Sequence, residues 1–392
     1  MLRRIALLSI AAPRRILAVA ALVMVAAAIF GIPVTKSLSA GGFQDPTSES
    51  AQATQLLTDK FHQGDMQIFV TVTSPDGFGS PKARAVATRI VDGFSKSPHV
   101  PVVTSAWTVP PQAAAELVSK DGKSGLIVAG VNGGENDAQR YAQALTDEFV
   151  HDADGVTVRS GGTAMVYSEI NEQTQHDLLL MESIAIPLSF LVMVWVFGGL
   201  ITAALPMVVG GMAIVGSMSV LRLITFSTDV SIFALNLSTA LGLALAIDYT
   251  LLIISRYRDE LDDGSSPRRA LVRTMATAGR TVLFSATTVG LSMAAMLLFP
   301  MYFLTSFAYA GIATVAFAAA AAVIVTPAAI WLLRNHLNAY DARELARRLL
   351  KRPAPAPKPV EELFWYRSTR MVMRRAVPIG RASCRERVYG LV

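Results

Sequence analysis

The amino-acid sequence predicts an α-helical membrane bundle of six spanning helices, with an α+β domain between the first and second spans. Of the 392 residues, 52% are apolar and only 16% are charged, whereas about a quarter are charged in soluble domains. Apolar runs of about 20 residues, long enough to cross a bilayer, recur along the chain. The long polar segment between the first two runs alternates strand-like and helix-like patterns.

The first apolar run is interpreted as an uncleaved span. It has 19 residues, longer than the 7–15 apolar residues usual for a signal peptide, and Pro33 and Lys36 interrupt the expected cleavage flank. A cleaved signal peptide is the alternative, since small residues follow in "SLSAGG". The six predicted spans are 16–34, 178–197, 200–221, 230–255, 281–299 and 304–333.

The positive charges gather on one side of the predicted membrane. The formal net charge is +6 and the pI is about 9.5, but arginines cluster before the first span, between the fourth and fifth, and after the sixth. The short loops on the other side carry only Arg222. This bias predicts that both ends of the chain are cytoplasmic, in a multi-pass plasma-membrane protein. It explains the basic charge without nucleic-acid binding.

The segment 37–177 is predicted to be a folded domain outside the cytoplasm. Its β-branched runs and helical apolar spacing follow one another in the order β-α-β-β-α-β. This order is typical of the ferredoxin-like fold, in which two helices cover one face of a four-stranded sheet. Any other small α+β domain is the alternative. The predicted elements are 66–73, 80–94, 100–109, 124–131, 136–150 and 155–162, followed by a helix over 163–177 that leads into the second span.

Three further segments complete the organisation. The stretch 264–280 is expected to form a basic amphipathic helix lying on the cytoplasmic surface. Residues 335–378, Pro-rich in part, are interpreted as a cytoplasmic linker towards a seventh span that the sequence does not reach. The last residues, 379–392, differ in character from the rest and are interpreted as a non-native tail. They hold Cys384, the only cysteine, so no disulfide is expected.

The sequence lacks several motifs that are typical of enzymes. It has no phosphate-binding G-x-x-x-x-G-K-[ST] loop, no G-x-S-x-G and no H-E-x-x-H. The five histidines are scattered and match no zinc spacing. We therefore expect a protein that is not an enzyme and needs no cofactor or metal.

Asp248 is the residue that calls for a functional explanation. It lies in the apolar stretch "LGLALAIDYTLLIISRYRDE", eight residues before Arg256 and hence about 12 Å from the end of its helix. An aspartate at a helix centre in hydrocarbon costs about 2.5–3.5 kcal/mol. It can take up a proton or meet a partner from another helix. Asp248 is therefore a candidate proton carrier, with a static polar contact between helices as the alternative.

Four neighbours of Asp248 complete the predicted site. Tyr249 follows about 100° further around the helix, so both side chains can face one bundle interior, and the Tyr249 hydroxyl can donate to a carboxylate or relay a proton. For Tyr249 alone, packing with one hydrogen bond is an equal alternative. Gly242, Ala244 and Ala246 are expected to let a neighbouring helix approach closely.

Several motifs together resemble the MmpL (MMPL) transporters of the resistance-nodulation-division superfamily. The resemblance covers about residues 1–377. It rests on "GGFQDPTSESAQATQLL" (41–57), "ALAIDYTLLIISRYRDEL" (244–261), "TAGRTVLFSATTVGLSMAAML" (277–297) and "FPMYFLTSFAYAGIATV" (299–315). It implies the six-helix first half of a twelve-span exporter, with a porter domain outside the membrane.

The resemblance also implies a mechanism and partners. Asp248 and Tyr249 match the family's proton-relay pair on the fourth span, which normally faces a second Asp-Tyr pair in the other half. Lipids or amphipathic small molecules would be the cargo, protons the driving ion and membrane lipids the surroundings, with a homo-oligomer left open. Two rivals stay open: a non-transporting scaffold or sterol-sensing-like receptor, and a protein-secretion auxiliary of the same superfamily.

Overall fold

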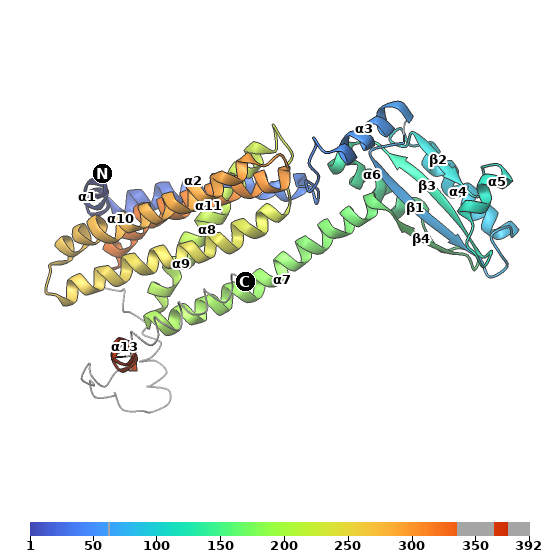
Figure 1. Ribbon diagram of the computed structural model, residues 1–392. Coiled ribbons are helices and arrows are strands. Elements are labelled where there is room, and N and C mark those ends of the chain that lie inside the picture. The colour runs from blue at the N-terminus through green and yellow to red at the C-terminus, as the bar shows by residue number, and fades with distance from the viewer. Residues whose placement is uncertain (62, 335–363, 375–392) are drawn as a thin grey trace, which may run out of the picture. The chain divides into compact units, whose positions relative to one another are not determined.

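The computed structural model describes residues 1–61, 63–334 and 364–374. Six of its helices are long and apolar enough to cross a membrane, as the sequence predicts (Figure 1). Most begin or end within a few residues of the predicted bounds, but α7 and α10 each begin more than ten residues earlier, in polar sequence that continues the helix. These helices are α2 (Pro13–Gly31, continued by the 3₁₀ turn η1, Ile32–Ser37), α7 (Thr163–Phe197), α8 (Leu200–Ile224), α9 (Phe233–Asp262), α10 (Pro267–Ala294, continued by η3, Ala295–Leu298) and α11 (Tyr302–Leu333).

Helix α11 lies at the centre of the bundle. It packs against α2, α8, α9 and α10, and two thirds of its most apolar window is buried. Its buried face is dominated by alanine, and small side chains of this kind let helix backbones approach closely in apolar surroundings. Gly216 of α8 is an example, because a methyl group there would lie 2.5 Å from the ring of Phe317 on α11.

The segment 264–280 differs from its prediction. It is the first half of α10, continuous with the fifth span, and not a separate helix on a membrane surface. Its apolar face, including Leu271 and Met275, is buried in the bundle core, and α10 contacts the short N-terminal helix α1 (Leu2–Ala11). The arginines of this segment stay exposed. The amphipathic pattern is present, but protein rather than lipid covers its apolar side.

A buried ion pair joins the ends of α9 and α10. The Glu260 side chain is 5% exposed and accepts from Arg256 Nη2 at 2.7 Å, while Arg273 Nη1 of α10 lies 3.4 Å from its second oxygen. Both arginines are partly exposed, so their charges stay hydrated while the carboxylate is enclosed. The pair fixes the turn that connects the two helices.

The domain between α2 and α7, here called the sheet domain, has the predicted ferredoxin-like topology. Its four strands are β1 (Met66–Thr73), β2 (Val102–Ser105), β3 (Ser124–Val131) and β4 (Thr157–Gly161). They pair antiparallel in the order β2-β3-β1-β4. Alternate residues of β1 are buried under α4 (Pro81–Ser95) and α6 (Gly134–Phe149).

Local chemistry explains where these elements begin and end. Ser80 caps α4 as predicted, with its hydroxyl accepting from the Ala83 amide at 3.3 Å. Strand β2 is shorter than the predicted 100–109, because Pro101 precedes it and a turn follows Ser105. The helix expected from residue 136 begins at Gly134, where Asp65 Oδ2 accepts from the Gly133 and Gly134 amides at 2.8 Å each. An unpredicted helix, α3 (Glu49–Phe61), precedes β1.

Helix α7 connects the two parts without a break. It starts directly after β4 and contacts β1 and α6 at one end and α8 at the other (Figure 1). The predicted helix over 163–177 and the second span are therefore one continuous helix of 35 residues. At 1.5 Å per residue it is about 52 Å long, longer than an apolar bilayer core of about 30 Å.

A carboxylate forms a second junction between the sheet domain and the bundle. Glu135, in the first turn of α6, accepts from the Gly42 amide at 2.9 Å and from the hydroxyl of Tyr302, the first residue of α11. The Tyr302 hydroxyl also lies 3.2 Å from Ser39 Oγ. The segment after η1 is itself tied to the bundle, since Ser39 exchanges backbone hydrogen bonds with Val230 and Ile232.

Two glycines make this junction possible. A side chain at Gly41 would collide with the Glu135 carboxylate, and one at Gly42 would come within 2.6 Å of the Tyr302 ring. Gly42 also has a φ of +96°, which L side chains rarely adopt. The glycine pair therefore lets the chain pass between the first turns of α6 and α11.

Replacing Glu260 by Ala should destabilise the bundle. The change removes the carboxylate that Arg256 and Arg273 contact. We therefore expect the free energy of unfolding to fall by about 1.5–3 kcal/mol, the range for hydrogen bonds to charged groups. A lower midpoint of thermal unfolding in detergent measures this. Asp259→Ala, at an exposed neighbouring position, is the matched control and should change stability by no more than about 0.5 kcal/mol. Equal shifts for the two variants would contradict a structural role for the ion pair.

Replacing Glu135 by Leu should open the junction at Gly42. The Gly42 amide and the Tyr302 hydroxyl lose their shared acceptor, a change worth about 1–3 kcal/mol. Amide hydrogen exchange over residues 41–43 should accelerate roughly tenfold, since 1.4 kcal/mol corresponds to that factor. Glu135→Gln keeps an acceptor oxygen and should have a smaller effect, and Glu148→Leu, on the same helix at an exposed position, should have none. Unchanged exchange in Glu135→Leu would show that this contact does not hold the segment.

Candidate functional site

Asp248 lies close to the middle of α9. It is 15 residues after Phe233 and 14 before Asp262, so about 22 Å of helix extends on either side. The surrounding turns are apolar, and no other acidic residue occurs between Phe233 and Arg258. The helix therefore places one carboxyl group deep in an apolar segment, as the sequence predicts.

The two residues of the Asp-Tyr pair point in different directions. Tyr249 is 4% exposed and belongs to the bundle core, whereas Asp248 is exposed on the outer face of α9. Within the described residues, Tyr249 therefore faces the core of the bundle and Asp248 faces its surface. Successive residues on a helix are about 100° apart, which is enough to place one in the core and the next at its surface.

A groove between α9 and α10 nevertheless brings the two side chains together. It has a volume of about 360 Å³ and is lined by Asp248 and Tyr249, by the hydroxyl residues Ser255, Thr281 and Ser285, and by four apolar residues, Leu245, Leu251, Leu252 and Val282. The Tyr249 hydroxyl is buried without a hydrogen bond of normal geometry among the described residues, and Ser285 of α10 is the hydroxyl beside it. The exposed carboxyl of Asp248 and the buried phenol of Tyr249 line the same groove, and groups of these two kinds can exchange a proton.

The three small residues before the pair have separate positions. Gly242 packs against α8 and α11, since a methyl group there would lie 3.0 Å from Ile214 and 3.3 Å from Thr314. Ala246 is fully buried and faces Gly210 of α8. Ala244 instead lies on the exposed face, one turn before Asp248. The small size of Gly242 and Ala246 thus allows α8 to pack closely against α9. Ala244 adds only a methyl group to the exposed face beside Asp248.

The exposed face of α9 continues in both directions from Asp248. Asn236, Ala240 and Ala244 precede it at intervals of four residues, and Ser255 follows it. Residues four apart lie on one face of a helix. Apart from Leu252, which is 37% exposed, this side of α9 consists of small or polar residues, whereas α7 exposes large apolar residues such as Leu191 and Trp195.

Glu182 of α7 is a second acidic residue in a predicted span, and the sequence reasoning missed it. It lines a mostly apolar cavity of about 290 Å³ between α7, α8 and α9, where it faces Thr239 and Asn236 of α9. The signal was present, because Glu182 interrupts the apolar run 178–197 near its start. Only the structure shows that it points towards α9, the helix that carries Asp248.

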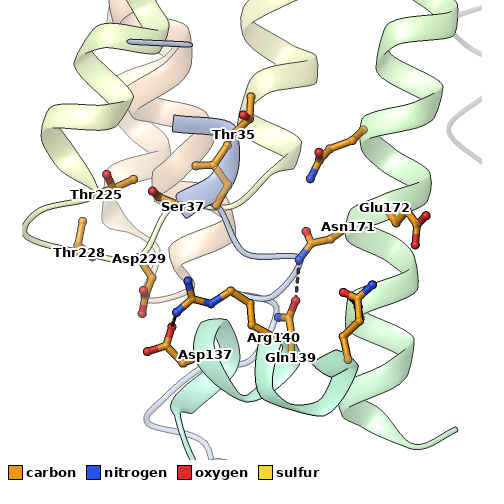
Figure 2. Close-up of a pocket in the computed structure, with 14 residues that line it drawn as sticks. Thr35, Ser37, Asp137, Gln139, Arg140, Asn171, Glu172, Thr225, Thr228 and Asp229 are labelled. Atoms are coloured by element: carbon orange, nitrogen blue, oxygen red, sulfur yellow. Dashed lines mark hydrogen bonds and ion pairs between the residues drawn. The ribbon is translucent and has the colours of Figure 1, made fainter. Parts of the chain in front are cut away.

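A larger polar pocket lies where the sheet domain meets the bundle (Figure 2). It has a volume of about 440 Å³ and is lined by residues of η1, α6, α7 and the connection between α8 and α9. No single segment of the sequence indicated it, because its residues are far apart in the chain. Among the lining residues are Ser37, Gln139, Gln143, Asn171, Thr225 and Asp229.

The acidic and histidine side chains of the described residues form no metal-binding cluster of three or more. His99, for example, stacks on the ring of Tyr141 at a centroid distance of 3.5 Å. The predicted linker (335–378) lies outside the described residues except for the short helix α13 (Phe364–Arg374), and the predicted tail (379–392), which holds Cys384, lies outside them entirely. The groove beside Asp248 and the polar pocket are therefore the two candidate sites.

Comparison with known proteins identifies relatives of this chain. The trehalose monomycolate exporter MmpL3 of Mycobacterium tuberculosis (strain ATCC 25618 / H37Rv) is 32% identical over 329 residues, covering 81% of this chain and 34% of the exporter. The mycolic acid-containing lipids exporter MmpL11 of Mycolicibacterium smegmatis is 26% identical over 363 residues, covering 90% of this chain and 36% of that protein. This chain thus spans about a third of the length of these relatives.

A solved structure agrees on the fold. The crystal structure of a heavy metal efflux pump matches with a TM-score of 0.50 over 75% of this chain and 41% of the pump, at 14% sequence identity. The model of the MMPL family matches residues 42–379, which include the sheet domain, the pair Asp248–Tyr249 and the last five spans. The chain is a multi-pass membrane protein and belongs to the MMPL family of transporters.

Proposed function

We propose that this protein takes part in the proton-driven export of lipids or other amphipathic small molecules across the plasma membrane. Membership of the MMPL family supports a transport function, and two relatives are named as exporters of trehalose monomycolate and of mycolic acid-containing lipids. The observation that carries the proposal is the position of Asp248, a carboxyl group at mid-helix in an apolar span.

Asp248 is the proposed proton carrier. Desolvation favours its neutral form, and a polar partner or water favours its charged form. Its exposed position beside a groove with Tyr249 and Ser285 gives it access to both environments as neighbouring helices move. The membrane potential contributes about 2.3 kcal/mol per proton per 100 mV, which is enough to bias such a movement.

A second helix bundle is the proposed partner of the outer face of α9. Between Asn236 and Ser255 this face carries small or polar side chains except for Leu252, so a second helix can approach it closely at Ala240 and Ala244. A second Asp-Tyr pair on that helix would let the two acids share protons, and the two bundles would rock around the site between them.

The proposed orientation places the sheet domain outside the cytoplasm. The connections at its end of the bundle carry Arg222, whereas the other end carries the α1 arginines and the exposed Arg268 and Arg269 of α10. Lys and Arg are retained on the cytoplasmic side. In this orientation, substrate reaches the sheet domain from the outer leaflet or from a cavity beside α7.

Replacing Asp248 by Asn in the protein expressed from its complete gene should abolish export. The amide is close in size but cannot exchange a proton, so we expect a loss of roughly 100-fold or more, the scale of proton-transfer contributions. The measurement is export of lipid from proteoliposomes energised by a pH gradient, with the amount of protein in the membrane determined in parallel.

The matched control is Asp259→Asn, which makes the same chemical change at an exposed position near the end of α9. It should export at the rate of the unaltered protein. Export by Asp248→Asn that remains sensitive to the gradient would remove the proton-carrier role. Activity without any dependence on the gradient would favour a scaffold or receptor function.

A further inference from the structure

A further groove, here called the α2–α11 groove, lies between the first and the sixth spans. Its volume of about 390 Å³ falls within the range of about 300–1,000 Å³ for ligand sites. Helices α2 and α11 supply its walls, and Met212 of α8 also lines it. Among the described residues, none from α9 or α10 does so. The α2–α11 groove is therefore separate from the groove beside Asp248.

Small side chains leave this groove open. Ala20 of α2 and Ala320 and Ala321 of α11 line it, and none of them is large enough to fill the space between the helices. Towards its other end α2 is held closely to the bundle, since Ser219 Oγ of α8 donates to the Ala27 carbonyl at 2.8 Å. Only 6% of the most apolar window of α2 is buried. Along the groove, α2 therefore has little contact with protein.

Arg15 lies at the end of the groove nearest the start of α2. It is the one polar side chain among the described lining residues. Arg15 is exposed, and a long basic side chain can lay its stem on an apolar surface while its charge reaches the membrane surface. From Arg15 to Met24, the last lining residue of α2, the helix rises about 14 Å. This is close to half of an apolar core of about 30 Å, so the groove is as deep as one leaflet.

Three more arginines accompany Arg15 without a counter-charge. Arg14 precedes it, and Arg3 and Arg4 lie on α1, which is joined to α2 through a single residue and contacts α10 and α11. No acidic residue occurs before Asp45, and none of the described acidic side chains pairs with these arginines. The topology bias explains why arginines occur in this part of the chain. It does not explain an apolar groove that opens beside one of them.

We infer that the α2–α11 groove binds an anionic phospholipid, with one acyl chain in the groove and the phosphate at Arg15. A guanidinium forms strong hydrogen bonds with phosphate, and basic pockets between spans bind anionic headgroups. Arg14, Arg3 and Arg4 add positive charge that favours a lipid with a net negative charge over a zwitterionic one. This lipid is a resident part of the bundle that fills the gap between α2 and α11, and it is distinct from any cargo. The proposed orientation places it in the cytoplasmic leaflet.

The test uses photoreactive phospholipids that carry the same diazirine in the acyl chain and differ in their headgroup. Phosphatidylglycerol, phosphatidylcholine and phosphatidylethanolamine probes are placed in phosphatidylcholine nanodiscs with the protein from its complete gene. Peptide mapping should locate the phosphatidylglycerol label at residues 16–24 and 317–325. Its yield should exceed that of either zwitterionic probe roughly fivefold, the factor for about 1 kcal/mol per basic residue. Salt at roughly 1 M should reduce this preference, because it screens exposed charges.

Matched variants separate the charge from the groove. Arg15→Gln should reduce phosphatidylglycerol labelling to the level of the zwitterionic probes. Arg269→Gln makes the same change at an exposed position of α10 at the same end of the bundle but outside the groove, and it should keep the preference. Ala20→Phe fills the groove and should cause loss of labelling there by all three probes. Ala21→Phe, at the exposed next position of α2 outside the lining, should leave labelling unchanged.

Each contrary outcome identifies another occupant of the groove. Equal labelling by the three probes would indicate ordinary boundary lipid, and no labelling by any probe at residues 16–24 and 317–325 would indicate that protein covers the groove. Either result, or a phosphatidylglycerol preference that persists in Arg15→Gln, would overturn the inference. Asp248→Asn should keep the preference, since Asp248 lies outside this groove. Failure of the lipid inference would thus leave the export proposal intact, and the reverse also holds.

Discussion

The constraint on which this structure depends is the cost of an aspartate in the middle of an apolar helix. The bundle does not remove that cost by burying Asp248 in a polar network. It leaves the carboxyl at the surface of α9, beside a groove that contains a phenol and three hydroxyls. A group in this position responds to whatever covers it, because its protonation depends on whether water, lipid or a polar partner is adjacent. That sensitivity makes it suitable for energy coupling.

Three helices connect this carboxyl to the rest of the molecule. Helix α9 runs from the edge of the polar pocket past Asp248 to the buried Glu260. Helix α11 packs along α9 and begins at Tyr302, whose hydroxyl contacts Glu135 of the sheet domain. Helix α7 belongs to both the sheet domain and the membrane bundle. Asp248 is therefore linked to the sheet domain through the packing of α7, α9 and α11.

Features that depend on local sequence patterns could be predicted from the sequence. Features that depend on which segments pack against one another could not. Hydropathy predicted the six spans, and β-branched runs predicted β1 and β3 at their observed bounds. The side of α9 that faces outward depends on Ile214 and Thr314, which no pattern within α9 reveals. Segment 264–280 carries the same amphipathic signal whether lipid or protein covers it. The polar pocket escaped prediction because Ser37, Gln143, Asn171 and Asp229 each look like ordinary surface residues.

The protonation state of the Asp248 carboxyl is the most direct measure of proton coupling. Difference infrared spectroscopy of the reconstituted protein resolves the C=O stretch of a protonated carboxyl, and Asp248→Asn assigns the band. Reversal of the pH gradient across the vesicle should make this band appear and disappear as the transporter changes conformation. A band that stays constant, present or absent, under both gradients would show that Asp248 never exchanges its proton, and the coupling mechanism would then have to lie elsewhere.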